Sequence, residues 1–299
     1  MLLYHFGYGD HGPARHGKRL RPRLLMEIAQ ADGGGVADAL DAAAAIEFLH
    51  NYSLIHDDIE DRDELRHGRQ ALWVKYGLAQ AVNAGDALCA ISFLALLEAR
   101  QHHGPERVVR MVHALHDAHL IMCDGQSLDI AFESARKVDL AQYFKMIGAK
   151  TAALFGAACE LGALCSEASD ATIASARELG RHFGLGFQIL DDVLGIWADS
   201  AATGKLPAID IARRKWTYPV VWALSGPASS ARNAIARAYA ASAPLEARDV
   251  STVVEALDSL GARSAANTAI AEHLDFVERY PVGDVRNFLL GSLTLASHQ

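Results

Sequence analysis

Two acidic clusters offer residues whose types and spacing could hold a metal ion. The first, Asp57, Asp58 and Asp61, closes an apolar, Ala-rich stretch that begins near Val36. In a helix, Asp57 and Asp61 would lie at i and i+4 on one face, where like charges repel. Such a cluster persists if water solvates it or if a hard divalent cation binds it. A solvated acidic helix end is the commoner explanation for one cluster of this kind.

A second cluster favours the metal. Gln188, Asp191 and Asp192 close another apolar, helix-compatible run and share one helical face. Two helices that end in aspartate pairs predict two walls of one metal-filled cavity. Mg²⁺ takes one or two protein carboxylates and completes its shell with water and substrate phosphates. The two clusters therefore predict Mg²⁺ and a phosphorylated substrate.

Basic residues are dispersed along the chain in the way that a diphosphate site requires, because Lys and Arg neutralise phosphate charge. Cations at a helix start oppose the helix dipole, and a bound anion would relieve that conflict. The alternative to anion binding is a solvated helix start for Lys18 and Arg21 and a plain surface position for Lys205 and Lys215. The basic stretches contain Lys18 and Arg21, then Arg66 to Arg69, Lys150 beside Thr151, and Lys205 with Lys215.

Composition narrows the class of protein. The chain has 299 residues and is 51% hydrophobic, which suffices for a sizeable core. Its net charge of −8 argues against a nucleic-acid partner. The cysteines show no zinc-type spacing and are typical of thiols in a reducing cytosol, so we expect a cytoplasmic protein. The most apolar stretch, 87–97, is shorter than the roughly 20 residues that span a bilayer, so we expect no membrane span or signal peptide.

The periodicity predicts an all-α single domain. Residues 1–16 have no clear period and are expected to be irregular, before a helical domain at 17–299. No stretch shows β alternation or a hairpin signal. The segment 77–100 is apolar all round, which predicts burial in the core or against a partner subunit. The expected helices are 21–31, 36–62, 77–100, 108–133, 139–163 with a bend near Gly148, one or two within 167–197, and several after 219.

The order of these motifs resembles the trans-isoprenyl diphosphate synthases, the polyprenyl synthetase family, over roughly residues 17–219. The resemblance rests on GKRLRP, LIHDDIED with LRHGR, GQSLD, KTA, FQILDD and TGK…D…K.T.P. It implies a bundle of roughly ten or more helices around a central cavity. It also implies a homodimer that condenses isopentenyl diphosphate with an allylic diphosphate. About three Mg²⁺ ions would act in each site, with Mn²⁺ as a substitute.

The same resemblance assigns a role to each candidate residue. The metal ligands would be Asp57, Asp58, Asp61, Asp191 and Asp192. The site for isopentenyl diphosphate would contain Lys18, Arg21, His50 and His67, although His50 alone could equally be a satisfied core residue. The allylic diphosphate would be surrounded by Arg66, Lys150, Thr151, Gln188, Lys205 and Lys215, with Gln126 and Asp129 behind them. The catalytic residues would be Asp57, Asp61, Asp191, Lys150 and Lys205.

Product length has its own candidates. Tyr52 and Ser53 are the fifth and fourth residues before the first aspartate, where related synthases line the channel for the growing tail. Five residues of helix span about 7.5 Å. A ring at Tyr52 would therefore close the channel little more than a turn below the metals. This predicts a C15 product, with C20 next.

Four features depart from the family pattern. Gly195 stands where the second motif usually has a third aspartate, and His67 replaces the second of two arginines. Histidine has a reference pKa of about 6.5 and is only partly cationic at neutral pH. Gln70-Ala71 replaces Pro-Thr, and Ala208 replaces Gly. Two alternatives stay open: a class I terpene cyclase, which needs no second diphosphate site, and a weakly active or non-catalytic prenyltransferase subunit.

Overall fold

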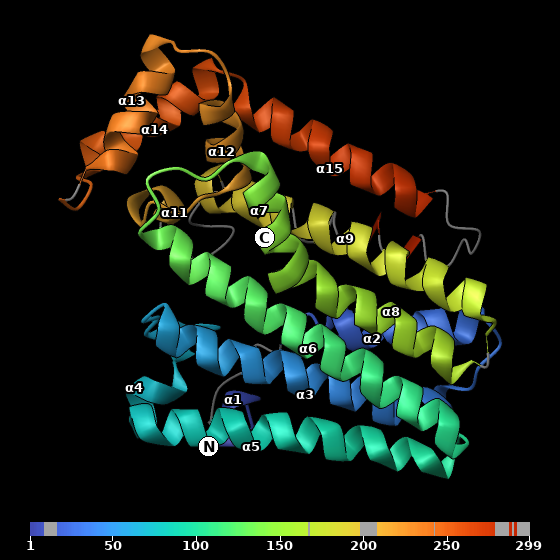
Figure 1. The fold of residues 1–299 in the computed structure, drawn as a ribbon. Coiled ribbons are helices and arrows are strands. Elements are labelled where there is room, and N and C mark those ends of the chain that lie inside the picture. Colours follow the sequence, from blue (N-terminus) through green and yellow to red (C-terminus); the bar gives the residue numbers. More distant parts are fainter. Residues whose placement is uncertain are drawn as a thin grey trace. The chain divides into compact units, whose positions relative to one another are not determined.

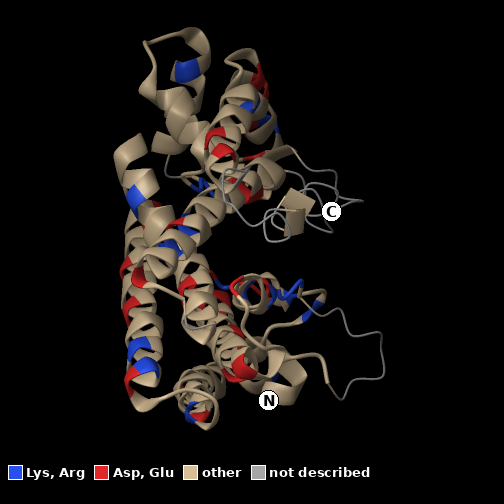
Figure 2. Cartoon of the chain, turned by 90° about the vertical axis from the view of Figure 1, so that its right-hand side faces the viewer, with Lys and Arg blue, Asp and Glu red and all other residues tan. Residues whose placement is uncertain are grey.

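The computed structural model describes residues 1–8, 17–166, 168–197, 208–241, 243–278, 287–288 and 290–291. Over these ranges the chain is almost wholly helical, with one two-stranded sheet (Figure 1). The predicted all-α class is confirmed. Acidic and basic positions are interspersed along the described helices (Figure 2). The chain separates into two compact units, residues 1–119 with 157–177 and residues 120–156 with 178–299.

The first unit is built on the long helix α3, Val36–Glu60, which packs against α2, Leu20–Ala31, and α5, Leu78–Leu97. Gly35 precedes α3, and the Asp38 carboxylate accepts the Gly35 N–H at 3.2 Å. The unit also contains α1, Leu2–His5, α4, Leu72–Tyr76, the 3-10 turn η1, Glu98–Gln101, and parts of α6, Pro105–Glu133, α8, Ala153–Cys165, and α9, Asp170–Trp197.

The apolar helix α5 is less buried within the chain than its sequence predicts. Leu78 is 57% exposed and Leu94 63%, and Val109 on α6 reaches 67%. The prediction of burial in the core is confirmed for Ala81, Leu88 and Leu96 of α5. It is wrong for Leu78 and Leu94, and burial of these two against a partner subunit remains a prediction. Two helical segments, 78–101 and 140–165, are long and apolar enough to cross a membrane. That is weak evidence, because core helices of soluble proteins meet the same criteria.

Within the described residues the chain forms one β-hairpin, although the sequence shows no hairpin signal. Strands β1, Leu65–Arg66, and β2, Arg69–Gln70, pair antiparallel, with Arg66 opposite Arg69. The turn residues His67 and Gly68 have φ of 52° and 76°. Positive φ at both central residues matches the twist of a two-residue hairpin. The prediction failed because each strand is too short to show alternation.

The first eight residues are also more ordered than expected. Residues 2–5 form helix α1, while 9–16 lie outside the described residues. A four-residue helix is unstable alone because nucleation is costly. It persists because Tyr4 is buried in a cluster with Ile55, Leu72 and Leu88. The expectation of an irregular start is therefore wrong for α1, and tertiary packing is the reason.

The second unit is built around α9 and a cluster of shorter helices. These are α7, Leu140–Ile147, the π-helical turn η2, Gly148–Ala152, α11, Ile209–Ala212, α12, Tyr218–Ser225, α13, Ser230–Ala240, α14, Ala247–Ser259, and α15, Ala262–Glu278. The π turn lies at the bend predicted near Gly148. Such turns interrupt helices frequently at functional sites.

Helix α9 runs unbroken through its glycines. Gly184 does not end it, because the glycine allows a close approach: a Cβ there would lie 2.6 Å from Cα of Ala152. On α6, Gly125 similarly leaves room for the backbone of Lys150. Two glycines thus let α6 and α9 press against the π turn within this unit.

Candidate active site

The carboxyl end of α3 carries the first acidic cluster in the geometry that the sequence predicts. Asp61 is the C-cap of α3, and its N–H donates to the carbonyl oxygen of Asp57 at 2.8 Å. Both side chains are half-buried. Carboxylates at this end of a helix oppose its dipole and repel each other. A cation bound between them would relieve both effects.

Asp58 has a different environment from its neighbours. Its side chain is buried, and Oδ1 accepts a hydrogen bond from Nε of Arg66 at 2.9 Å and a second from the same guanidinium. Burial raises the pKa of the Asp58 carboxyl, and the bonds from Arg66 oppose the rise. The pair crosses from α3 to strand β1. Asp58 therefore fixes the direction of Arg66.

Arg21 and His50 form a half-buried pair in the same unit. The Arg21 guanidinium donates to Nε2 of His50 at 3.1 Å. Burial lowers the pKa of His50 well below its ordinary value, so the ring is neutral and can accept. Burial lowers the pKa of Arg21 to about 10, against the charges of Glu47 and Asp57. Arg21 thus remains cationic within electrostatic reach of the first motif.

The hairpin joins this basic group to α1. Arg69 donates to the carbonyl oxygens of Tyr4 and His5 at 2.8 and 3.1 Å, and so clamps the end of α1. His5 in turn lies 3.1 Å from Oδ1 of buried Asn51. Burial, followed by the charges of Arg66 and Arg69, lowers the pKa of His67. A Cβ on Gly17 would be 3.7 Å from the His67 ring, so the segment leading to exposed Lys18 lies beside this turn.

The predicted chain-length residues lie one turn earlier on α3. The ring of Tyr52 is 4.7 Å from that of His56 and 5.1 Å from that of His119, and it packs against the buried cluster that holds α1. The Ser53 hydroxyl donates to the carbonyl oxygen of His50 at 2.8 Å. Tyr52 is the bulkier of the two candidates, and its ring lies between those of His56 and His119.

In the second unit, Asp192 is the centre of a buried hydrogen-bond network. Its Oδ2 accepts from the Tyr143 hydroxyl at 2.6 Å and from the Tyr218 N–H at 2.8 Å. Its Oδ1 accepts from the Gln188 amide at 3.2 Å. Burial raises the Asp192 pKa to about 7. Asp192 thus holds the start of α12, whereas neighbouring Asp191 is exposed.

The π turn presents two predicted residues toward the same network. The Thr151 hydroxyl donates to Oε1 of Gln188 at 2.6 Å. Lys150 donates to Oδ2 of Asp129 on α6, and both side chains are mostly buried. Asp129 therefore pairs with the ammonium charge of Lys150.

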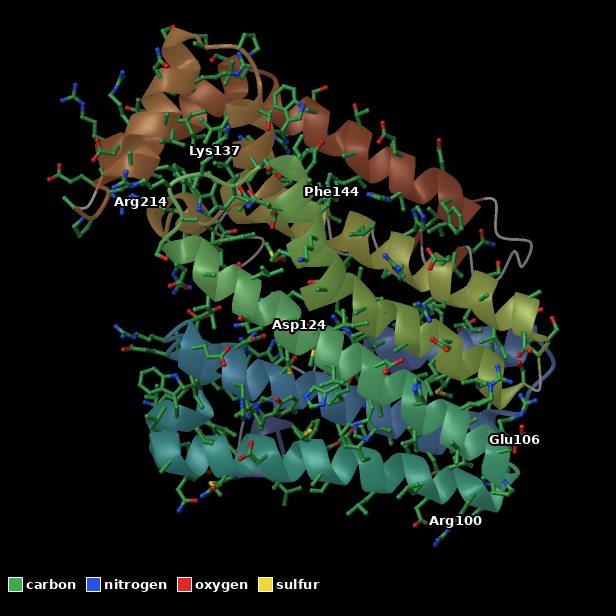
Figure 3. All side chains as sticks on the ribbon, in the orientation of Figure 1. Arg100, Glu106, Asp124, Lys137, Phe144 and Arg214 are labelled. Atoms are coloured by element: carbon green, nitrogen blue, oxygen red, sulfur yellow. The ribbon has the colours of Figure 1, made fainter. Side chains whose placement is uncertain are left out.

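The backbone of Lys215 is fixed from several directions. Its N–H donates to the carbonyl oxygen of Asp210 at 2.8 Å, and its own carbonyl accepts from the Tyr239 hydroxyl at 2.9 Å. Beside it, Arg214 donates to the carbonyl oxygen of Ala238 at 2.8 Å (Figure 3). These bonds attach the segment after α11 to α13. Predicted Lys205 lies outside the described residues.

The carboxylates of the described residues fit Mg²⁺ better than a metal that needs a full set of protein ligands. In the described residues no group of three or more His, Cys, Asp or Glu side chains is arranged to hold a metal ion. Mg²⁺ does not need one, because it takes one or two carboxylates and otherwise binds water and phosphate. Asp57 and Asp61 in one unit, and exposed Asp191 in the other, fit that requirement. Asp58 holds Arg66 through Oδ1, and Asp192 uses both oxygens to bind Tyr143, Gln188 and the start of α12, while the predicted part of both as metal ligands stays a prediction.

Some residues of these clusters were missed from the sequence. His5 belongs to a segment without period, and Tyr143 lies one turn before the π bend without a motif of its own. The capping pair of Asp139 and Gln142, with hydrogen bonds of 2.8 and 3.0 Å, does mark the start of α7. That signal could have placed Tyr143 on a known helix, but not beside Asp192.

Comparison with known proteins identifies a family. The sequence matches the family described as Polyprenyl synthetase over residues 8–257. A geranylgeranyl diphosphate synthase of Mycobacterium tuberculosis is 38% identical over 278 residues, 92% of this chain and 78% of that protein. A (2E,6E)-farnesyl diphosphate synthase of Mycobacterium bovis is 35% identical over 294 residues, 95% of this chain and 81% of that protein.

Solved structures share the fold. A polyprenyl synthetase from Streptomyces coelicolor A3(2) has a TM-score of 0.88 at 32% identity and covers 99% of this chain and 90% of its own. A polyprenyl synthase from Caulobacter crescentus CB15, complexed with calcium and isoprenyl diphosphate, has a TM-score of 0.81 at 30% identity. The match covers 97% of this chain and 87% of that protein. Fold and relatives define the class of enzyme, a trans-prenyltransferase. The chain belongs to the polyprenyl synthetase family.

Proposed function

We propose that this chain is a Mg²⁺-dependent synthase that joins isopentenyl diphosphate to an allylic diphosphate. The observation that carries the proposal is the basic group beside the first acidic motif. Arg21 and Arg66 both lie within electrostatic reach of Asp57 inside one unit, Arg66 as the proposed contact for the allylic diphosphate and Arg21 as a separate cation positioned by His50. A cyclase that ionises one diphosphate has no need of this second cationic group. Lys18 would add a second cation, and His67, whose lowered pKa favours the neutral ring, would add a hydrogen-bonding group to a site for isopentenyl diphosphate.

The chain's residues have separate tasks in the reaction. Bound Mg²⁺ would stabilise the charge that develops on the departing diphosphate. Lys150 and Lys215 would hold the allylic diphosphate, and the bonds of Lys150 to Asp129 and of the Lys215 backbone fix them beforehand. Preorganised cations cost no reorganisation as charge develops. Lys205 is proposed for the same group from its sequence position alone.

The bond changes balance without a protein nucleophile. The allylic C–O bond breaks and its electron pair leaves with diphosphate. The double bond of isopentenyl diphosphate attacks the allylic carbon, and the adjacent proton is lost to the released diphosphate. The residues of this chain bind, orient and exclude water. Neutral His50 fits such a role, because it accepts from Arg21 and fixes its position.

One incubation tests the proposal. Purified protein is mixed with Mg²⁺ and labelled isopentenyl diphosphate, with and without C5, C10 and C15 allylic diphosphates. Prenyl diphosphates longer than the primer would support the synthase. A hydrocarbon from an allylic diphosphate alone would identify a cyclase, and no turnover would leave a non-catalytic subunit. Chelation of the metal and an Asp57→Asn variant serve as negative controls, and Mn²⁺ in place of Mg²⁺ should restore turnover.

The product is proposed to be C15, with C20 next. The support is the ring of Tyr52, which is enclosed by His56 and His119 a turn before the acidic motif. The two relatives described above carry names for both product lengths. The number of metal ions, about three in the proposal, is open to metal titration. The cytoplasmic location stays a prediction.

A homodimer is proposed from the exposed apolar side chains of α5 and α6. Leu78, Leu94 and Val109 are each more than half exposed, although α5 has an almost wholly apolar sequence. Large exposed apolar surface marks a site of association. A second copy of the chain is the occupant that the family resemblance implies, and Leu94→Glu tests it as described in the Discussion.

A further inference from the structure

Helix α1 is attached to α3 by polar and aromatic contacts. His5 lies 3.1 Å from Oδ1 of Asn51, whose amide group donates in turn to the carbonyl oxygen of Glu47 at 2.8 Å. Next to it, the ring of Phe6 lies 5.9 Å from that of Phe48 in an edge-to-face arrangement. Asn51, Glu47 and Phe48 all belong to α3. These contacts give the first residues of the chain a fixed place on α3.

The opposite side of α1 binds strand β2 of the hairpin. The Tyr4 hydroxyl donates to the carbonyl oxygen of Gln70 at 2.9 Å. The Arg69 guanidinium donates to the carbonyl oxygens of Tyr4 and His5, at the end of α1 where basic side chains commonly bind. The Lys75 ammonium lies 3.7 Å from the centre of the Tyr4 ring, a cation–π contact that joins α4 to the same anchor. Helix α1 therefore links β2 to α3.

The two strands of the hairpin are thus held by different elements. Arg66 on β1 is bound by Asp58 of α3, whereas β2 is bound by α1. His67 lies at the turn between them, beside the backbone of Gly17. A two-residue turn takes its position from the strands that it joins. The place of the His67 ring therefore depends on α1, and all of these residues belong to the first unit.

We propose that α1 positions the hairpin turn for isopentenyl diphosphate, with Tyr4 and Arg69 as the positioning residues. The inference rests on the proposed function, in which His67 belongs to the site for that substrate. It gives a role to residues that precede all the motifs on which the family resemblance rests. The hairpin would serve the two substrates through separate supports, α1 for His67 and Asp58 for Arg66. Groups held in place before binding spare the substrate the cost of ordering them.

Two conservative variants release β2 while keeping the packing of α1. Tyr4→Phe removes only the hydroxyl that binds Gln70. Arg69→Lys keeps the positive charge but loses the planar fork that reaches two carbonyl oxygens. Tyr76→Phe is the matched control, because its ring lies 5.7 Å from that of Tyr4, edge to face. Among the described residues, the Tyr76 hydroxyl makes no hydrogen bond to α1 or to the hairpin.

The experiment measures kcat, the KM of each substrate, binding of labelled isopentenyl diphosphate by equilibrium dialysis, and thermal unfolding. Tyr4→Phe and Arg69→Lys should each raise the KM and the Kd of isopentenyl diphosphate about three- to tenfold, the range of a lost hydrogen bond. The KM of the allylic primer and kcat should stay within about twofold of the parent. Tyr76→Phe should match the parent in every readout. Amide hydrogen exchange over residues 64–71 should be faster in the two variants only.

Two results would overturn the inference. One is a parental KM for isopentenyl diphosphate in both variants, whatever the rate of hydrogen exchange. The other is an equal rise in the KM of both substrates, which a general loss of structure would produce. If Arg69→Lys does not fold, Tyr4→Phe decides alone, since it keeps the buried ring.

Failure of the proposed function would be visible separately. A parent chain that makes no prenyl product would refute the synthase, and binding of labelled isopentenyl diphosphate would then decide the role of α1. Weaker binding in Tyr4→Phe with parental binding in Tyr76→Phe would uphold that role. Equal binding in the two variants would overturn it.

Discussion

Replacing Asp58 with Asn tests whether this carboxylate holds Arg66 in place or holds the metal. The Asp58 side chain is 2% exposed and that of Arg66 26%. Removing one partner of a buried ion pair costs about 3–5 kcal/mol, because the other charge stays desolvated. Since Arg66 keeps some contact with water, and Asn retains one acceptor, we expect the lower limit of about 3 kcal/mol. For a chain of this size that corresponds to a melting temperature lower by roughly 6 °C.

The matched control is Asp57→Asn on the same turn. Asp57 is half-buried and its neighbour Asp61 carries the same charge, so its loss relieves repulsion as well as removing attraction. We expect a melting temperature within about 2 °C of the parent, with turnover lost because the metal loses a ligand. Thermal unfolding followed by circular dichroism, and consumption of labelled isopentenyl diphosphate at fixed Mg²⁺, give the two readouts separately.

The two variants should therefore differ in which property is lost: stability in Asp58→Asn and turnover in Asp57→Asn. Asp58→Asn should lose stability and retain measurable turnover when assayed well below its melting temperature, with a higher KM for the substrate that Arg66 binds. Parental melting in Asp58→Asn, together with complete loss of turnover, would refute the reasoning and return Asp58 to the metal ligands. Strong destabilisation in Asp57→Asn would equally contradict it.

Three further outcomes are expected. Tyr52→Ala should lengthen the product by one or more C5 units, because the channel gains the volume of a ring, while Tyr52→Phe should not; an identical length distribution after hydrolysis and chromatography would exclude Tyr52 as the floor. Burial lowers the pKa of His5 to about 4, so its neutral form contributes stability above pH 6.5 that is lost as the pH falls toward 4. The His5→Gln side chain can still donate to Asn51, so between pH 6.5 and 4 the free energy of unfolding of this variant should fall by up to about 3 kcal/mol less than that of the parent. An equal pH dependence of the two free energies, measured by denaturant unfolding, would exclude His5 as the source. Leu94→Glu should shift the chain to monomer in sedimentation, while Arg100→Ala, at an exposed charged position, should not; equal sedimentation of Leu94→Glu and the parent would contradict the proposed interface.

The sequence predicts the main helices because their information is local. Helix α3 is Ala-rich and apolar, and its start at Val36 follows three glycines. The i and i+4 spacing of Asp57 and Asp61 depends only on helix geometry, and the structure retains it up to the C-cap. The bend near Gly148 was also predicted, although not that it would be a π turn.

Features that depend on distant contacts were not predictable. Helix α1 is too short to form alone and exists because Arg69, more than sixty residues away, binds its last carbonyls. The roles of the paired aspartates could not be separated either. Asp58 and Asp192 look like their neighbours in sequence, but both are buried, and each accepts a hydrogen bond from a distant residue, Arg66 and Tyr143 respectively.

A departure from a family pattern has a physical meaning only when the space around it is known. By sequence, Gly195 is a missing aspartate and suggests a weakened enzyme. In a helix interior glycine costs about 1 kcal/mol relative to alanine, so a position free of constraint would be expected to gain a side chain. Asp210 supplies the constraint, because any Cβ at 195 would displace its carboxylate. The glycine thus costs the helix some intrinsic stability, and any side chain placed at 195 would require the Asp210 carboxylate to move.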